Sequence, residues 1–364
     1  MNRIRLNLDK LSANSHDICI GTDLSDRMGL IMAKNGWAAR YIVVTDDRVR
    51  ALHGERVIGI LRSLSLTVDM IDIPSGETAK RIETCVGIAE RLIELGADRT
   101  SALIALGGGV VGDITGFVAS MYMRGIPYLQ MPTTLVAQVD SAIGGKTGID
   151  LAAGKNLLGA FHQPKAVFID LAFLATLDDR EFGNGLAEVI KYGIIEDPSL
   201  LDILEREGQA LRERDQVLLE KIVTRACQIK KGIVEIDETE RGLRRILNFG
   251  HTLGHAVETA SGYVLSHGEA VAIGMAAAAK LSEKMGYLAP EDRGRILALI
   301  GTLGLPTRIP AGLDPDEILQ RIGRDKKKTG DRVPFVLIRK PGMPFMNGGV
   351  PESLLRDTIG ELRG

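Results

Sequence analysis

Residues 101–113 read SALIALGGGVVGD, an apolar run that passes directly into three consecutive glycines. The run is short, rich in aliphatic residues and bounded by glycine, which is typical of a buried strand in a parallel sheet. Gly107, Gly109 and Gly112 match the pattern GxGxxG, whose glycines let a backbone approach a pyrophosphate and present N–H groups to it. This stretch predicts an α/β domain, in which the loop either holds a dinucleotide or forms a plain tight turn.

The dinucleotide fingerprint is only half met, because the loop comes late among the expected strands and no acidic residue stands about 20 positions downstream. The flanking sequence nevertheless continues the α/β pattern. Strands are predicted at 41–47, 66–73, 101–109 and 166–170, an amphipathic helix ending at a glycine at 81–96, and a first strand within residues 1–10. The first half of the chain is therefore expected to be α/β.

After about residue 175 the pattern changes. Residues 216–236 and 268–286 carry long helical periodicity, and few strand candidates remain. The stretch 340–351, which is rich in proline and glycine, reads as a loop. A chain of 364 residues fits two domains of roughly 100–200 residues, so we expect an α/β domain over 1–175 and a mostly α-helical domain over 176–364.

The composition is that of a folded protein, with 45% hydrophobic and 25% charged residues. The net charge of −2 excludes the global positive field of a nucleic-acid-binding protein, so an anionic ligand must meet a local cluster of cations. No stretch reaches the ~18 apolar residues of a bilayer span, and the N-terminus lacks the apolar run of a secretory signal. Three distant cysteines without a CxxC pair predict a reducing compartment, and a cytoplasmic protein is expected.

A second glycine cluster, DSAIGGKTG at 140–148, comes within one residue of the P-loop pattern GxxxxGK[ST]. Asp140 stands where that pattern needs glycine and would set a negative charge against a phosphate, so a nucleoside triphosphatase is excluded. Lys146, with Lys155 and Asn156 of a GKN triplet, could still grip a single phosphate or carboxylate. Solvated surface lysines are the alternative, although both lysines stand among glycines rather than on a charged helix face.

Three of the six histidines, His251, His255 and His267, fall within a short stretch beside glycines. His251 and His255 are spaced i,i+4 as in an HExxH zinc helix, but Thr252 stands where that motif needs its glutamate, so a metalloprotease is excluded. Clustering favours a metal site over isolated structural histidines.

A carboxylate would complete such a site as a hard ligand. Glu188, in the otherwise apolar stretch GLAEVIKYG, is a candidate, and an intrahelical ion pair with Lys191 is the alternative. Spacing alone excludes neither interpretation, and it leaves open which of the histidines bind the metal.

Six segments resemble 3-dehydroquinate synthases and occur in the family's order between about residues 40 and 330. They are GGGVVGDITGFVASMYMRGIP (107–127), MPTTLVAQVDSAIGGKTGID (131–150), GKNLLGAFHQP (154–164), GLAEVIKYGII (185–195), LRRILNFGHTLGHAVE (243–258) and HGEAVAIGM (267–275). The resemblance implies a Rossmann-like N-terminal domain for NAD, a helical C-terminal domain with one divalent metal ion, usually zinc or cobalt, and a homodimer.

The reaction that this resemblance implies belongs to the shikimate pathway. It converts a small phosphorylated keto acid, 3-deoxy-D-arabino-heptulosonate 7-phosphate, to 3-dehydroquinate and phosphate. The steps are transient oxidation by NAD, phosphate elimination, re-reduction and intramolecular aldol closure, so NAD is a catalyst rather than a consumed substrate.

The resemblance also implies roles for individual residues. Metal ligation falls to Glu188, His251 and His267, which leaves His255 for the substrate phosphate. NAD contacts fall to Asp46, Glu77, Lys80, Gly109, Val110, Val111, Gly112, Asp113, Thr133, Thr134, Lys155, Thr176 and Glu181. Substrate contacts fall to Asp140, Lys146, Asn156, Lys191, Lys230, Arg244, Asn248 and a lysine of the DKK run, Lys326 or Lys327, with Arg124 reaching in from a partner chain.

Three other functions compete with this one. Another sugar phosphate cyclase would have less use for Lys230 and Arg244, which suit a substrate carboxylate. A metal-dependent polyol dehydrogenase would generally ligate its metal with aspartate and histidines rather than with Glu188. A structural zinc site would need four closed ligands, commonly cysteines, and no cysteine stands near the histidines. Neither a nucleic acid nor a membrane is an expected partner.

Two departures from the family pattern are local. Phe182-Gly183-Asn184 stands where the family more often has Leu-Arg-Ser, and the segment after residue 340 is not the usual ending. Both lie outside the implied ligand positions, so they affect the expected packing rather than the expected chemistry.

Overall fold

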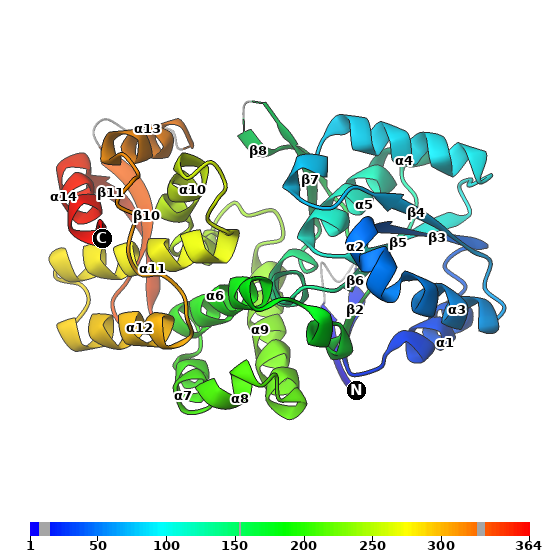
Figure 1. Ribbon diagram of the computed structural model, residues 1–364, viewed down its shortest axis with the longest axis horizontal. Coiled ribbons are helices and arrows are strands. Elements are labelled where there is room, and N and C mark those ends of the chain that lie inside the picture. The colour runs from blue at the N-terminus through cyan, green and yellow to red at the C-terminus, as the bar shows by residue number, and fades with distance from the viewer. Residues whose placement is uncertain (7–14, 153, 326–331) are drawn as a thin grey trace. The chain divides into compact units, whose positions relative to one another are not determined.

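The computed structural model describes residues 1–6, 15–152, 154–325 and 332–364. Within these ranges the chain forms two compact units (Figure 1). The first comprises Met1–Leu177 and Leu219–Thr239, and the second comprises Asp178–Leu218 and Glu240–Gly364. The chain therefore leaves the first unit after Leu177, returns to it at Leu219 and leaves it again after Thr239. The expected division has a single boundary, between residues 175 and 176, and does not include this return.

The first unit is built on a seven-stranded sheet in the order β1-β2-β9-β6-β5-β3-β4. β1 pairs antiparallel with β2, and the other neighbours run parallel. The strands predicted at 41–47, 66–73, 101–109 and 166–170 are confirmed as β3, β4, β5 and β9. The strands are β1 (Asn2–Leu6), β2 (His16–Gly21), β3 (Arg40–Asp46), β4 (Val68–Ile73), β5 (Ser101–Gly107), β6 (Tyr128–Pro132) and β9 (Ala166–Asp170).

Helices cover both faces of this sheet (Figure 1). Met28 of α1 and Leu61 of α3 share a core with Val43 of β3, whereas Ile88 of α4 lies in a second core with Val44. Consecutive strand residues point to opposite faces, so the two cores lie on the two sides of the sheet. The helices are α1 (Ser25–Asn35), α2 (Asp47–Val49), α3 (Glu55–Ser63), α4 (Ile82–Glu94) and α5 (Gly109–Met121).

Helix α9 (Gln216–Ile236) has the predicted bounds, but most of it belongs to the first unit rather than to the helical second half. Lys230 Nζ lies 2.6 Å from Asp140 Oδ1, and Cys227 Sγ donates to the Gln138 carbonyl at 3.4 Å. These tertiary contacts place most of α9 in the first unit, and the helical periodicity of its sequence carries no information about such contacts. The unit also contains the antiparallel hairpin β7 (Lys146–Leu151) and β8 (Gly154–Phe161), and short turns η1 (Arg50–Gly54), η2 (Glu77–Ala79), η3 (Tyr122–Arg124), η4 (Ala137–Ser141) and η5 (Leu171–Thr176).

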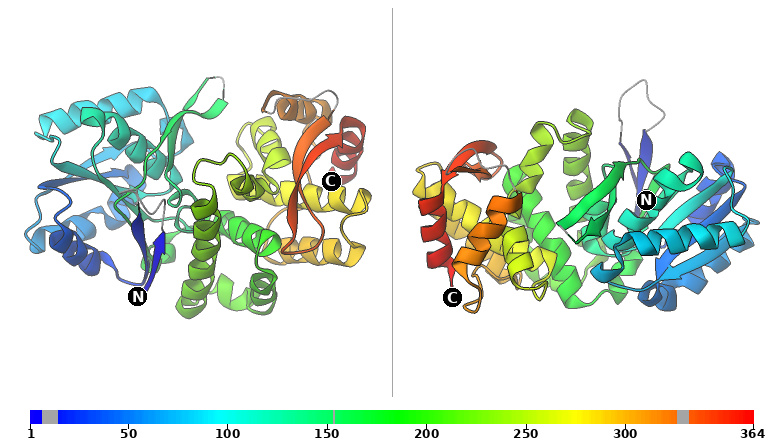
Figure 2. Two further views of the ribbon diagram at one scale, coloured as in Figure 1. Left: turned by 180° about the vertical axis from the view of Figure 1, so that it is seen from behind. Right: turned by 90° about the horizontal axis from the view of Figure 1, so that it is seen from above.

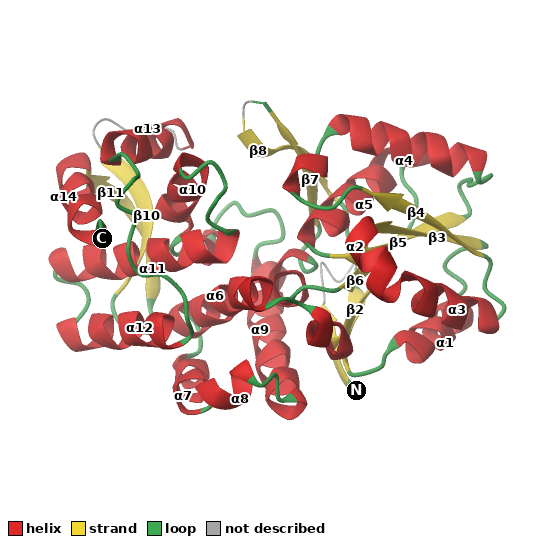
Figure 3. Cartoon of the chain, in the orientation of Figure 1, coloured by secondary structure: helices red, strands yellow, loops and turns green. Residues whose placement is uncertain are grey.

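The second unit is mostly helical, as expected, and Figure 3 shows a two-stranded sheet among the helices of its C-terminal part. No helix in the described ranges combines enough length with enough apolarity to cross a bilayer. The helices are α6 (Asp179–Ile195), α7 (Pro198–Arg206), α8 (Gly208–Arg212), η6 (Leu243–Asn248), α10 (His251–Ala260), α11 (His267–Lys284), α12 (Pro290–Thr302), α13 (Pro315–Asp325) and α14 (Glu352–Leu362).

The expectation of a loop over 340–351 holds for residues 340–343 and is wrong for the rest of the segment. Residues of this segment form β11 (Pro344–Pro351), which pairs antiparallel with β10 (Arg332–Ile338) next to α14 (Figure 2). Leu337 and Val350 are buried in a core with Ile359 of α14. Pro344 and Pro351 occupy the two ends of the strand, where a missing N–H is tolerated, so composition misled the prediction.

Candidate functional site

The glycine loop of the first unit joins the end of β5 to the start of α5. Gly112 N donates to the Gly108 carbonyl at 3.0 Å, and no side chain of the described residues caps the helix at Gly108. A Cβ on Gly109 would lie 3.0 Å from Ser141 Oγ, and one on Gly112 would lie 2.9 Å from Gln130 Oε1. A Cβ at either position would press on a neighbouring side chain, so packing favours small residues here, while the N-terminus of α5 remains suited to an anion.

The segment after β6 lies directly beside this loop. Thr133 N donates to the Gly107 carbonyl at 2.9 Å, and a Cβ on Gly108 would lie 3.1 Å from Thr134 Cγ2. Thr134 Oγ1 in turn accepts from Ala137 N at 3.2 Å. The structure thus brings the two threonines expected to contact NAD to the same edge of the sheet as the glycines.

Lys80 connects expected cofactor and substrate residues. Its buried Nζ lies 2.6 Å from Asp113 Oδ2 at the start of α5 and 2.6 Å from Asn156 Oδ1 on β8. Burial lowers the pKa of Lys80, but Asp113 and Glu77 outweigh burial and leave the pKa above its ordinary value. Lys80 is therefore a cation held between the glycine-loop helix and the β7–β8 hairpin.

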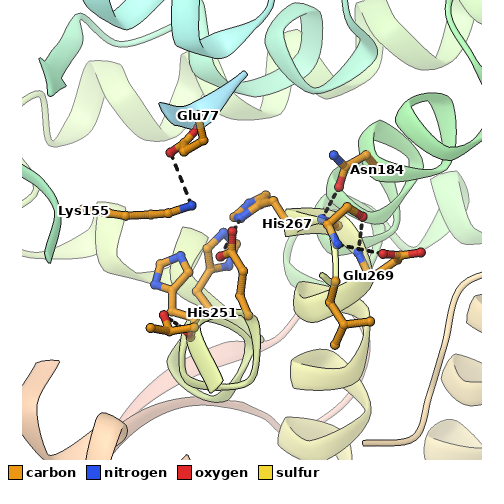
Figure 4. A network of polar contacts seen from close by, with 12 residues as sticks. Glu77, Lys155, Asn184, His251, His267 and Glu269 are labelled. Carbon is orange, nitrogen blue, oxygen red and sulfur yellow. Dashed lines mark hydrogen bonds and ion pairs between the residues drawn. The ribbon is translucent and has the colours of Figure 1, made fainter. Parts of the chain in front are cut away.

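The remaining expected NAD residues lie at four further places. Lys155 and Glu77 form an ion pair (Figure 4), with Lys155 Nζ 3.3 Å from Glu77 Oε1. Asp46, at the end of β3, accepts from Val49 N at 2.8 Å and so caps α2. Thr176, at the end of η5, is within hydrogen-bond distance of His53 Nε2, at 2.8 Å. Glu181 belongs to the second unit, in the first turn of α6.

Four expected substrate residues of the first unit differ in burial. Lys230 is buried and pairs with Asp140, so the residue that broke the P-loop pattern anchors α9 instead. Lys146 begins β7 and is exposed. Arg124 is exposed as well, with a left-handed backbone φ of 69°.

The second unit gathers Glu188 with two of the three clustered histidines. Glu188 Oε1 lies 3.4 Å from His251 Nε2 and 3.5 Å from His267 Nε2, and one ligand atom from each residue falls within 4.8 Å of the others. Figure 4 shows His251 and His267 in this cluster. Lys191 Nζ also pairs with Glu188 Oε2. Glu188 therefore both faces the two histidines, as a metal ligand would, and forms the intrahelical ion pair that was the alternative.

Three helix positions create this cluster. Glu188 is fully buried in the middle of α6, His251 is the first residue of α10, and His267 is the first residue of α11. A Cβ on Gly254 would lie 3.0 Å from the Ala270 carbonyl, so glycine lets α10 and α11 pack closely and brings their histidines together. A carboxylate oxygen and two imidazole nitrogens are a donor set that divalent transition metals accept, with positions left for substrate or water.

The two histidines differ in protonation. Burial lowers the pKa of His251 to about 3, which keeps its imidazole neutral. Burial also opposes charge on His267, but Glu188 and Glu258 outweigh it and raise the pKa of His267 to about 10. Two carboxylates therefore favour positive charge at the position of His267.

Other expected substrate residues of the second unit lie in η6 and α10. The His255 ring is 5.9 Å from that of His267, and its side chain is exposed. Arg244, in η6, is 1% exposed, and η6 packs against α6. Asn248 Nδ2 donates to Glu240 Oε1 at 2.9 Å. Lys326 and Lys327 lie outside the described residues.

Two family models together match most of the chain. The N-terminal 3-dehydroquinate synthase model matches residues 70–184, and the C-terminal model matches residues 185–328. The chain belongs to the 3-dehydroquinate synthase family. The three potential metal ligands, Glu188, His251 and His267, therefore lie in the part matched by the C-terminal model. The glycine loop lies in the part matched by the N-terminal model.

Curated 3-dehydroquinate synthases resemble the chain over nearly its whole length. A 3-dehydroquinate synthase from Desulforamulus reducens is 45% identical over 333 residues, covering 91% of this chain and 93% of that protein. One from Caulobacter vibrioides is 44% identical over 353 residues, covering 95% of each.

Solved structures of related cyclases share the fold. A 2-epi-5-epi-valiolone synthase from Streptomyces hygroscopicus with bound NAD+ and Zn2+ is 32% identical, with a TM-score of 0.89 over 98% of this chain and 99% of that one. A 2-deoxy-scyllo-inosose synthase complexed with carbaglucose-6-phosphate, NAD+ and Co2+ is 25% identical, with a TM-score of 0.86 over 99% and 100%. A glycerol dehydrogenase from Schizosaccharomyces pombe, 18% identical with a TM-score of 0.70 over 95% and 88%, shares the fold alone.

Asn184, in the segment 182–184 that departs from the 3-dehydroquinate synthase pattern, makes specific contacts between α6 and α11. Asn184 Oδ1 accepts from Gly268 N at the start of α11 (Figure 4). Asn184 Nδ2 donates to Glu181 Oε2 at 3.2 Å. A Cβ on Gly268 would lie 2.4 Å from the Asn184 carbonyl, so α6 and α11 touch through backbone. Asn184 thus fixes the helix end that carries His267.

Sequence reasoning missed Glu258. It lies three residues after His255 on α10, so the two side chains share a helix face, and its Oε2 lies 3.8 Å from His267 Nδ1. The i,i+3 spacing in HAVE was visible in the sequence. Only the packing of α10 against α11 shows that this face meets His267.

Proposed function

We propose that this chain catalyses the reaction for which its family is named, forming 3-dehydroquinate and phosphate from 3-deoxy-D-arabino-heptulosonate 7-phosphate. The observation that carries the proposal is the convergence of Glu188, His251 and His267 from three helices in the segment matched by the C-terminal 3-dehydroquinate synthase model. The curated relatives of that name are about 45% identical to the chain over most of its length, which supports the same substrate. The enzyme would be a lyase that eliminates phosphate.

One divalent ion, zinc or cobalt, is the proposed metal, and Glu188, His251 and His267 would hold it. The neutral imidazole of His251 and the carboxylate of Glu188 suit such an ion, and the related cyclases were solved with Zn2+ or Co2+. When bound, the metal would supply Lewis acidity toward the substrate hydroxyl that is oxidised.

NAD is the proposed redox cofactor, and the related cyclases were solved with NAD+. The glycine loop and the N-terminus of α5 would take its pyrophosphate, with Thr133 and Thr134 beside it. When bound, NAD would accept a hydride from the substrate and return it within one cycle. Lys80 would fix the distance between this loop and Asn156.

Local cations would recognise the two anionic groups of the substrate. Lys191 and Arg244 are almost fully buried, and buried cations require anionic or hydrogen-bonding partners. A guanidinium binds a carboxylate through two parallel hydrogen bonds, so Arg244 suits the substrate carboxylate. His255, exposed beside His267, would donate a hydrogen bond to the phosphate through its imidazole.

A homodimer is proposed as well, with Arg124 acting in the partner's site. Met121 and Met123 beside it are 48% and 42% exposed, and exposed apolar side chains of this size suit an interface. A cytoplasmic location agrees with three buried, unpaired cysteines.

A second candidate is another sugar phosphate cyclase, because the solved relatives include a valiolone synthase and an inosose synthase. The deciding experiment supplies the purified protein with NAD and zinc or cobalt. It then offers either the carboxylated seven-carbon keto acid phosphate or glucose 6-phosphate, which has no carboxylate. The proposal predicts phosphate release from the first substrate only, and release from glucose 6-phosphate alone would favour the second candidate.

A further inference from the structure

The imidazole of His267 lies between two carboxylates, one at each ring nitrogen. Its Nε2 is 3.5 Å from Glu188 Oε1, and its Nδ1 is 3.8 Å from Glu258 Oε2. Glu258 is 5% exposed, so this carboxylate faces the ring from inside the protein. The proposed metal site uses the Glu188 side of the ring and assigns nothing to Glu258.

The position of the ring proton decides which nitrogen can bind a metal. A neutral imidazole has one N–H donor and one lone pair, and only the nitrogen with the lone pair can act as a ligand. An ionised carboxylate can only accept a hydrogen bond, so Glu258 favours a proton on Nδ1 and Glu188 favours one on Nε2. A metal ion bound at Nε2 would replace the second proton, and the neutral ring would then keep its proton on Nδ1. This tautomer leaves the Nε2 lone pair directed to the side of Glu188 and His251.

His251 follows the same rule with a different acceptor. Its Nδ1 lies 3.2 Å from the Phe249 carbonyl, and its Nε2 faces Glu188. Both histidines therefore have an oxygen atom facing Nδ1, a carbonyl at 3.2 Å for His251 and a carboxylate at 3.8 Å for His267, and both present Nε2 to Glu188. Acceptors in this place orient the ring and raise the basicity of a ligand nitrogen.

We infer that Glu258 is a positioning residue that fixes the tautomer and ring orientation of His267 for metal binding. The inference rests on the metal site of the proposed function and adds to it a carboxylate that does not itself bind the ion. The close packing of α10 on α11 at Gly254, one turn before Glu258, holds the carboxylate at this distance.

An alternative role for the same residues is a second metal site. One ligand atom each from His255, Glu258 and His267 fall within 4.8 Å of one another. That site would use His267 Nδ1 as a ligand and remove its proton, which conflicts with the tautomer inferred here. Binding of one zinc ion per chain agrees with the inference, and binding of two at similar affinity overturns it.

The test measures zinc affinity by chelator competition in the full chain and in Glu258→Gln and Glu258→Leu. Glutamine keeps an oxygen acceptor for Nδ1–H, whereas leucine has a similar size and no acceptor. We expect Glu258→Leu to bind zinc about 10–100-fold more weakly, the usual effect of losing such an acceptor, and Glu258→Gln to restore most of the affinity. Equal affinity in Glu258→Leu and the unsubstituted protein overturns the inference, as does an equal loss in both variants.

Glu269→Leu is the matched control. Glu269 also lies at the start of α11, but it caps the helix with Ser266 and pairs with Arg180 rather than with His267. We expect this variant to lower thermal stability and to leave zinc affinity unchanged. A loss of affinity as large as that of Glu258→Leu would show that helix stability, rather than the Nδ1 acceptor, controls binding.

A direct observation covers the case in which Glu258→Leu does not fold. Nitrogen-15 NMR of histidine-labelled, zinc-loaded protein reports which ring nitrogen carries the proton. The inference predicts a proton on Nδ1 of His267, whose signal shifts in Glu258→Gln, and a proton on Nε2 overturns it. If the unsubstituted protein binds no zinc, the proposed metal site itself fails, which is distinct from failure of the role of Glu258.

Discussion

The backbones of Gly274 and Gly250 approach so closely that a Cβ on Gly274 would lie 1.8 Å from the Gly250 carbonyl oxygen. Gly250 precedes α10 with a positive φ of 81°, and Gly274 lies in the middle of α11. The atoms nearest to the missing Cβ are backbone atoms, which cannot rotate away as a side chain can. The spacing of α10 and α11, and with it the distance between His251 and His267, depends on these glycines.

Gly274→Ala is therefore expected to destabilise the protein by about 3 kcal/mol or more, the upper range for an overpacked core. It should also weaken zinc binding, because α10 must move relative to α11. Thermal unfolding and chelator competition measure the two effects.

Gly294→Ala provides the control. Gly294 lies in α12, and a Cβ added there would meet no atom within 4 Å, so alanine should stabilise the helix by about 0.5–1 kcal/mol. If Gly274→Ala unfolds at the temperature of the unsubstituted protein, the helices are not locked at this spacing.

The second prediction separates metal ligation from substrate binding. His267→Ala should lose bound metal and activity together, whereas His255→Ala should keep its metal and lose mainly turnover. The reason is that His267 faces Glu188, while His255 is exposed beside it. Elemental analysis of the purified variants measures the metal. Full metal content in His267→Ala would contradict the ligand assignment.

The third prediction concerns anion recognition. Arg244→Gln removes a charge-assisted partner worth about 1.5–3 kcal/mol, so kcat/KM for the carboxylated substrate should fall by about ten- to a hundredfold. NAD affinity should not change. Arg245→Gln is the control, because Arg245 is the exposed neighbour of buried Arg244. Equal losses for substrate and NAD in Arg244→Gln would mean that Arg244 supports the fold instead.

The fourth prediction concerns pH and the thiols. Burial raises the pKa of Cys19, Cys85 and Cys227, to about 12 for Cys85. At pH 8 a thiol reagent should therefore react slowly with native protein and rapidly with three thiols after unfolding. Fast labelling of any cysteine in the native protein would contradict this burial.

The same shift links stability to alkaline pH. The unfolded thiol ionises at its ordinary pKa of 9.0, whereas folded Cys85 stays neutral up to about pH 12. The unfolded state thus binds fewer protons in this window, so the free energy of unfolding should fall as pH rises from 9 to 12. In Cys85→Ala the decline should be shallower, and an unchanged slope would exclude Cys85 as its source.

Local periodicity predicted the helices and strands whose own sequence carries a clear apolar pattern. β3, β4, β5 and β9 follow their aliphatic runs, and α4 and α11 follow their helical patterns. Local patterns failed where tertiary contacts decide the outcome. Residues 344–351 form a strand because Val350 packs into the core of the second unit, and α9 joins the first unit through Lys230 and Asp140.

The candidate site shows the same division. Clustering of histidines indicated a metal site, and Glu188 was a candidate ligand on its own chemistry. Spacing could not choose among His251, His255 and His267, because the packing of α10 on α11 sets which rings meet. Glu258 was missed because its partner, His267, lies on another helix.

The proposed reaction requires that hydride leaves and returns within one catalytic cycle that expels phosphate. The decisive experiment follows phosphate release and absorbance at the reduced nicotinamide band together, with substrate in large excess over NAD. We expect many equivalents of phosphate per NAD and no stoichiometric net reduction of the cofactor. One reduced nicotinamide formed per substrate consumed, with no phosphate released, would contradict the proposed reaction and favour a polyol dehydrogenase.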